Sequence, residues 1–215
     1  MTFLCAILVA VESLSPTNQA LAKPVLEHPT LRREYAPHKI LGRVEHFEFL
    51  LDHMDVCSVV SEQTGLIDYR AVAQPDGRLY AENKEQAKGF LSLIGCEPGR
   101  RIFYMEGTQR GLFTAKGAGV IVLDYKQITP TEMECRGRLF VRIENSVVAT
   151  LARMFFVFLK GAVDRNYRLV IAQPLDLTQL ASGFPQELRE FIATLTAADQ
   201  ALVEPFTALL AQPPQ

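Results

Sequence analysis

The residues best suited to acid–base chemistry are Asp52, His53 and Asp55, which stand together in the segment LDHMD at positions 51–55. A carboxylate beside an imidazole can orient the ring and raise its basicity, as general acid–base catalysis requires. Successive residues on a helix point in different directions, so these three side chains do not share a face. The pattern favours a polar helix end, and we expect no catalytic residue in this chain.

Metal, redox and phosphate sites lack their sequence signatures. The histidines His28, His38 and His46 do not have the spacing of metal ligands. The four cysteines are widely scattered, at Cys5, Cys57, Cys96 and Cys135. We interpret them as small apolar core residues. The glycine-containing segment 107–119 is not followed by the Gly-Lys-Ser/Thr of a phosphate loop. We therefore expect no metal and no cofactor.

Composition predicts one folded domain with extensions. The chain has 215 residues, of which 48% are hydrophobic and 21% charged, and this is enough to bury a core without disulfides or metals. A net charge of −2 supplies no broad attraction for nucleic acid, so we expect no nucleic-acid partner. Arg100, Arg101, Arg110 and Lys116 either form a basic rim or are scattered solvated charges. The oligomeric state cannot be derived from these numbers.

The N-terminus has the apolar run Phe3–Val11, and Gln19–Ala22 then forms a small-x-small pattern before Lys23. These features predict a signal peptide over residues 1–22 and a periplasmic or secreted protein. No basic residue precedes the run, so an N-terminal apolar helix on a cytoplasmic protein is the alternative. No run approaches the ~20 apolar residues that a membrane-spanning helix needs.

Two segments precede the region rich in strands. Residues 23–43 contain Pro24, Pro29 and Pro37, which prevent a continuous helix and indicate a proline-containing leader. Residues Val44–Val60 carry apolar side chains at the spacing of three and four that is typical of an amphipathic helix. Short β-like runs separated by turn signals then predict six antiparallel strands, over 69–73, 78–82, 87–94, 101–106, 117–125 and 133–143.

The last predicted strand alternates, with Leu139 and Val141 on one face and charged residues on the other, so one side of the sheet should be buried and the other wet. A very apolar helix should follow over 147–172 and end before Pro174. Residues 183–215 form a predicted C-terminal helical tail, with a short helix around Leu188–Leu195 and a frayed end.

A helix, a meander and one long C-terminal helix, joined through Arg138-Leu139-Phe140-Val141-Arg142-Ile143-Glu144-Asn145, resemble the helix-grip arrangement of the START-like (SRPBCC) superfamily, which includes polyketide cyclases and lipid-transfer domains. The resemblance implies an α+β fold over residues 44–182, in which an antiparallel sheet wraps around the long helix. It also implies a cavity for an apolar molecule between the two. Family members usually begin with a strand, whereas a leader stands here.

Aromatic and apolar side chains on the facing strands and helix, together with two single acids, are the candidates for lining that cavity. The predicted ligand-binding residues are Tyr69, Phe90, Tyr104, Glu106, Asp124, Leu139, Val141, Phe155 and Phe158. We expect binding or transport of a hydrophobic small molecule or lipid. The alternatives are a cyclase or aromatase, which needs convergent acids, and an interaction module whose apolar helix contacts a protein or, transiently, a membrane surface.

Overall fold

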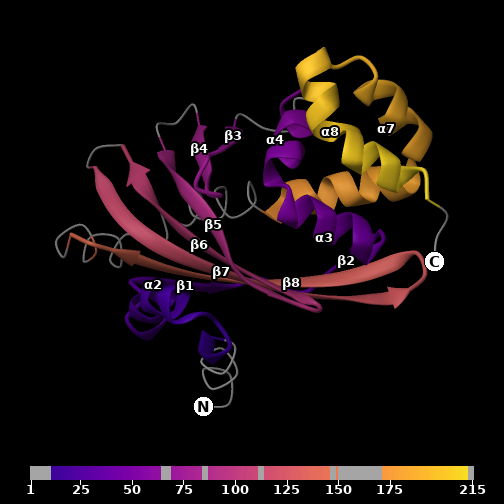
Figure 1. Ribbon diagram of the computed structural model, residues 1–215. Helices are drawn as coiled ribbons and strands as arrows, with labels where there is room; N and C mark the ends of the chain where they lie inside the picture. The colour runs from indigo at the N-terminus through magenta and orange to yellow at the C-terminus, as the bar shows by residue number, and fades with distance from the viewer. Residues whose placement is uncertain are drawn as a thin grey trace.

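An eight-stranded antiparallel sheet forms the middle layer of the molecule (Figure 1). The structure is a computed structural model that describes residues 11–63, 69–83, 87–110, 114–145, 149 and 171–212. One helix lies on one face of the sheet and the other described helices lie on the opposite face (Figure 1). The α+β class and the antiparallel meander predicted from the sequence are confirmed.

The six strands of the meander pair with their neighbours in chain order. They are β3 (Tyr69–Ala73), β4 (Leu79–Asn83), β5 (Ala87–Glu97), β6 (Arg100–Gln109), β7 (Ala115–Thr129) and β8 (Glu132–Ile143). Two of the predicted turns depend on glycine, because Gly77 and Gly99 have φ angles of 80° and 72°, a region that other residues rarely adopt. Local turn chemistry therefore determines the order of the strands.

Two further strands come from the segment that we interpreted as a leader. Strands β1 (Leu31–Glu34) and β2 (His38–Leu41) both pair antiparallel with β8. β8 is the last strand of the meander. Its pairing with β1 and β2 therefore places strands from the N-terminal part of the chain at this edge of the sheet. The chain thus begins its sheet with strands before its first inner helices, and the expected departure from the START-like order is wrong.

Helix α2 (Pro16–Glu27) extends into the first residues of the predicted leader and ends before Pro29, so the leader contains no continuous helix, as predicted. Its start is set by Ser15, whose side chain accepts a hydrogen bond from the backbone N–H of Asn18, and by Pro16 in the first turn. Pro24 lies inside the helix, near its end. Helix α2 therefore runs across the predicted boundary between residues 22 and 23, and the Gln19–Ala22 pattern lies within it.

Helix α2 packs against the sheet face that the sequence predicted to be wet. Buried side chains of α2, Ala22, Val25 and Leu26, form an apolar cluster with Val120 and Phe140 of β7 and β8. We call this side the outer face. The prediction of one solvated side is wrong, because it took the charged residues of β8 as representative of the whole face.

The opposite side, here called the inner face, is contacted by two short helices where one was predicted. Helix α3 (Val44–Asp52) ends at His53, whose backbone is not helical, and α4 (Met54–Gln63) begins directly afterwards. The break lets Phe47 and Met54 both reach the inner-face core, while Leu50 and Val60 turn toward the C-terminal helices. Ser58 of α4 accepts a hydrogen bond of 2.7 Å from the backbone N–H of Ala71 in β3.

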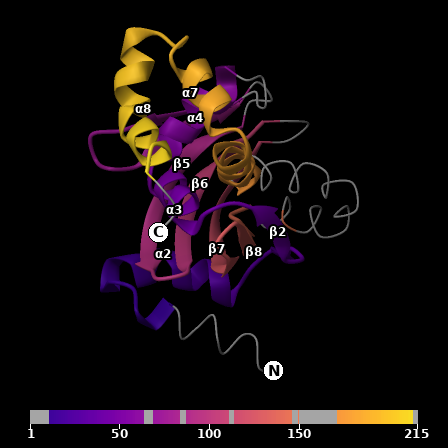
Figure 2. The same cartoon turned by 90° about the vertical axis from the view of Figure 1, so that its right-hand side faces the viewer.

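The C-terminal helices form a third apolar layer (Figure 2). Residues 171–183 are helical, so the predicted end before Pro174 is wrong, and most of the predicted helix over 147–172 lies outside the described residues. Helix α7 (Pro185–Ile192) confirms the short predicted helix. Helix α8 (Ala197–Leu210) lies in the predicted helical tail, and its Val203, Phe206 and Leu210 are buried against α3 and α4. The frayed end predicted through Pro213 and Pro214 lies outside the described residues.

Acid should destabilise this third layer through His46. The ring of His46 is 3% exposed and lies edge-on to Phe206 of α8, and neither ring nitrogen has a hydrogen-bond partner. Burial, and then the charge of Arg43, lower its pKa from 6.5 to about 4, against smaller opposing effects of Glu45 and the Leu209 carbonyl. The unfolded chain therefore takes up a proton between these pH values, and the folded chain does not.

Above pH 6.5 we expect no loss of stability from His46. As the pH drops to 4, the proton taken up by His46 in the unfolded chain should lower the free energy of unfolding by about 3 kcal/mol. Urea unfolding of the wild type and of His46→Phe at pH 7 and pH 4 measures this contribution, because the variant should lose that much less on acidification. His53→Gln, at an exposed position, is the control and should behave like the wild type. Equal acid losses in all three proteins would contradict the prediction.

Candidate functional site

The inner face of the sheet presents a continuous apolar surface across its central strands. Adjacent strands place Phe103, Ile121 and Leu139 side by side in one row, and all three are buried. The next row contains Leu91, Met105 and Val141, of which Met105 and Val141 are only partly buried. Ile171 and Leu175 of the helical residues 171–183 pack against this surface. The surface thus meets the helical residues 171–183, whereas most of the long helix predicted over 147–172 lies outside the described residues.

A row of glycines follows on the same face. Gly89, Gly107 and Gly117 are partners across β5, β6 and β7. A Cβ atom at any of these positions would collide with backbone atoms of the neighbouring strand, so only glycine permits the local approach of the strands. Gly119 lies in the same row as Met105, and the Met105 side chain occupies the position that a side chain at Gly119 would take. This half of the inner face is shaped by backbone and small residues.

A buried polar network closes the other end of the inner face. The guanidinium of Arg101 donates to both carboxylate oxygens of Asp52, at 2.8 and 3.0 Å, and to the hydroxyl of Tyr125 at 2.6 Å. The Tyr125 hydroxyl in turn donates to Glu48 at 2.8 Å. Two strands of the sheet are thereby connected to the last two turns of α3.

The network is suited to holding α3 rather than to moving protons. Burial, and then the hydrogen bond to Glu48, raise the pKa of Tyr125, so the phenol stays protonated. The hydrogen bonds to Asp52 raise the pKa of Arg101, which remains a cation. Arg101 is 5% exposed, so it does not belong to a basic rim on the surface. Both carboxylate oxygens of Asp52 accept hydrogen bonds from Arg101. The ring of His53 lies against the ring of Phe49, with 4.4 Å between the ring centroids.

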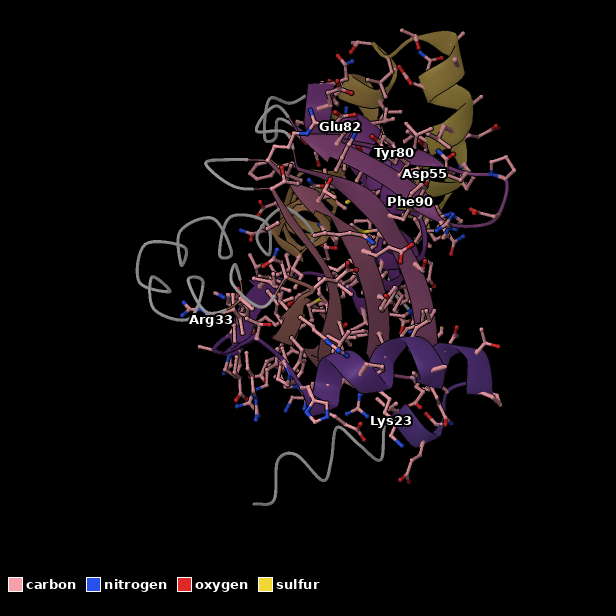
Figure 3. The ribbon with its side chains drawn as sticks, turned by 90° about the vertical axis from the view of Figure 1, so that its left-hand side faces the viewer. Lys23, Arg33, Asp55, Tyr80, Glu82 and Phe90 are labelled. Atoms are coloured by element: carbon pink, nitrogen blue, oxygen red, sulfur yellow. The ribbon has the colours of Figure 1, made fainter. Side chains whose placement is uncertain are left out.

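Four of the predicted ligand-binding residues point to the outer face. Phe90 lies beneath the guanidinium of Arg78, 4.1 Å from its ring centroid, and Glu106 pairs with the same guanidinium at 3.2 Å. Asp124 accepts hydrogen bonds from Arg100, at 2.6 Å, and from Arg138. Tyr104 packs on the outer-face cluster. Figure 3 labels Phe90 with Tyr80 and Glu82, away from Lys23 of α2.

The predicted set is therefore divided between the two faces. Leu139 and Val141 lie on the inner face as predicted, whereas Phe90, Tyr104, Glu106 and Asp124 cannot line a cavity between that face and the helix. Phe155, Phe158 and the side chain of Tyr69 lie outside the described residues. The inner-face residues Phe103, Met105 and Ile121 were missed as candidates, although they alternate with the outward residues.

The described residues provide neither a metal site nor a membrane-spanning helix. Within the described ranges, no group of three His, Cys, Asp or Glu side chains is placed to hold a metal ion. No helix in this part of the chain is both long and apolar enough to cross a membrane. Of the cysteines that the structure describes, Cys57 and Cys135 are buried, as we expected, and Cys96 is exposed.

A strand pair, two short helices, a meander and a C-terminal helix against the inner face together form a helix-grip arrangement. The fold is of the α+β, helix-grip type. The structure is similar to a conserved protein from Geobacillus kaustophilus, with 12% sequence identity and a TM-score of 0.48 over 67% of this chain and 95% of that chain. It is also similar to a START superfamily protein from Mycobacterium smegmatis, with 9% identity and a TM-score of 0.41 over 68% and 99%.

A third similar structure is the di-domain ARO/CYC BexL from the BE-7585A biosynthetic pathway, with 12% identity and a TM-score of 0.46. The match covers 73% of this chain and 53% of BexL. No protein-family model matches the sequence, and no curated protein matches it either. What this chain binds has to be inferred from its own residues.

Proposed function

We propose that the protein binds a hydrophobic small molecule or a lipid against the inner face of its sheet. The observation that carries this proposal is the apolar surface around Met105 and Val141, which is only partly buried among the described residues. Removing apolar area from water contributes about 25 cal/mol per Å², so a ligand without charge gains affinity from contact alone. The glycine row beside Met105 leaves room that side chains would otherwise take.

The positions of the acidic residues do not favour the cyclase alternative. It required acids that converge on a bound substrate, and Glu106 and Asp124 are instead paired with arginines on the outer face. Asp52, Glu48 and Tyr125, which form the polar network at one end of the inner face, are engaged with Arg101 and with one another. A binder or carrier therefore agrees better with the residues that the structure places on this face.

Two neighbouring substitutions on β6 test the proposal. Met105→Trp fills the inner face, whereas Glu106→Trp adds the same side chain to the outer face, where Glu106 is exposed. We expect Met105→Trp to weaken binding of the neutral dye Nile red at least about tenfold and to lower the amount of co-purifying lipid. Fluorescence titration and mass spectrometry of organic extracts give the two measurements. Equal effects of the two variants, or a wild type that binds neither dye nor lipid, would contradict the proposal.

A further inference from the structure

A separate groove lies on the outer face, between α2 and the sheet. Its volume is about 310 Å³. Leu21, Pro24 and Val25 line it from the helix, and Tyr104, Ala118 and Arg142 line it from β6, β7 and β8. The sheet separates this groove from the inner face, so it is independent of the site proposed above.

The groove exists because one small residue stands in a row of larger ones. Glu106, Ala118 and Arg142 are cross-strand neighbours on the outer face. Helix α2 rests on the adjacent row, which contains Val120 and Phe140, and only a methyl group fills the space over Ala118. The walls therefore combine aliphatic side chains with polar atoms, to which Tyr104, Arg142 and Glu144 contribute. The size is near the lower end of the range for small-molecule sites, about 300 to 1,000 Å³.

The charges around the opening are complementary to an anion. The guanidinium of Arg142 donates to the backbone carbonyl of Pro24 at 3.3 Å, and no carboxylate of the described residues pairs with it. Glu144 also lines the groove, but its carboxylate is already paired with Lys116 at 3.2 Å. Burial, and then the charges of Glu106 and Glu144, raise the pKa of Tyr104, so its phenol remains a hydrogen-bond donor. The groove is thus faced by one donor, by the Arg142 guanidinium without a carboxylate partner among the described residues, and by Glu144, which is paired with Lys116.

We propose that this groove binds a medium-chain fatty acid, with its alkyl chain between α2 and Ala118 and its carboxylate at Arg142 and Tyr104. A guanidinium can form two parallel hydrogen bonds with a carboxylate, which a neutral head group cannot match. The alkyl chain gains affinity with every methylene that leaves water. Helix α2 is then both part of the fold and one wall of a binding site.

Decanoate and decanol distinguish the contributions of charge and chain, and both are titrated calorimetrically into the full-length protein. Arg142→Gln should weaken decanoate binding at least about tenfold and leave decanol binding unchanged. Ala118→Leu should abolish binding of both, because the added side chain occupies the groove. Arg136→Gln is the matched control, since Arg136 lies on the same face of β8 but pairs with Glu34. It should bind decanoate like the wild type.

The position of the ligand is checked with a decanoate that carries a photoreactive diazirine, followed by peptide mapping. Labels on residues 16–27 and 115–129 that disappear in Arg142→Gln support the proposal. Labels on the inner-face residues alone, equal binding by Arg142→Gln and Arg136→Gln, or no saturable binding to the wild type would overturn it. If Ala118→Leu does not fold, the exposed position of Arg142 keeps the test valid. Failure of Nile red to bind the inner face would leave this result unaffected.

Discussion

Replacing Val25 by aspartate should lower the free energy of unfolding by about 4 kcal/mol. Val25 is 2% exposed and packs between α2 and the sheet. The substitution removes an apolar side chain from this cluster and introduces a carboxylate among apolar side chains. The loss is a large part of the 5 to 15 kcal/mol that folded proteins have in total. Urea denaturation followed by circular dichroism measures it.

Leu21→Asp is the control for this prediction, because Leu21 lies one turn earlier on α2 and is 39% exposed. The cost in helix propensity is slightly larger for Leu21→Asp than for Val25→Asp, so a larger loss of stability at Val25 reports burial. We expect Leu21→Asp to cost less than about 1 kcal/mol. If both variants unfold at the same urea concentration, α2 does not pack on the outer face. A chain cut after Ala22 would likewise begin inside α2 and lose part of this contact.

Arg101→Met should cost about 3 to 5 kcal/mol, because it leaves Asp52 and Glu48 beside a buried site without their cation. Arg100→Met is the matched control. Arg100 is the adjacent residue, points to the outer face and is more exposed than Arg101, and Asp124 keeps its pairing with Arg138 when Arg100 is removed, so the loss of Arg100 should cost about 1 kcal/mol. Chemical denaturation of the two variants compares the costs directly.

A double variant adds a second check on the network. Asp52→Leu in the Arg101→Met background removes the unpaired carboxylate and should recover part of the lost stability. The recovery should also restore the attachment of α3 to the sheet, which hydrogen exchange of the α3 amides reports. If Arg101→Met is no more damaging than Arg100→Met, the network does not hold α3.

The sequence was sufficient to predict the meander, because its signals are local. Each of the six strands was identified from a short apolar run, and the turn glycines Gly77 and Gly99 act within four residues of chain. The pairing of β1 with β8 has no such signal, since Leu31 and Val141 are far apart in sequence. Prolines near β1 and β2 concealed them, although edge strands tolerate proline.

The candidate site was less predictable because it depends on which way each strand faces. Phe103 and Tyr104 were grouped together as aromatic residues, yet neighbours on a strand point to opposite faces. Applying the alternation that placed Leu139 and Val141 inward to β6 would have selected Phe103 and Met105. The pairing of Arg101 with Asp52 spans 49 residues and leaves no pattern in the sequence.

The contact between α2 and the sheet also affects how the protein is made. Arg142 and Pro24, which touch in the folded molecule, are 118 residues apart. At about 5 to 20 residues per second, the ribosome needs roughly 6 to 24 seconds to complete that stretch. During this time α2 has been synthesised, whereas β7 is completed only near its end and β8 after it. Val25 and Leu26 therefore cannot be buried against these strands until this stretch of the chain has been made.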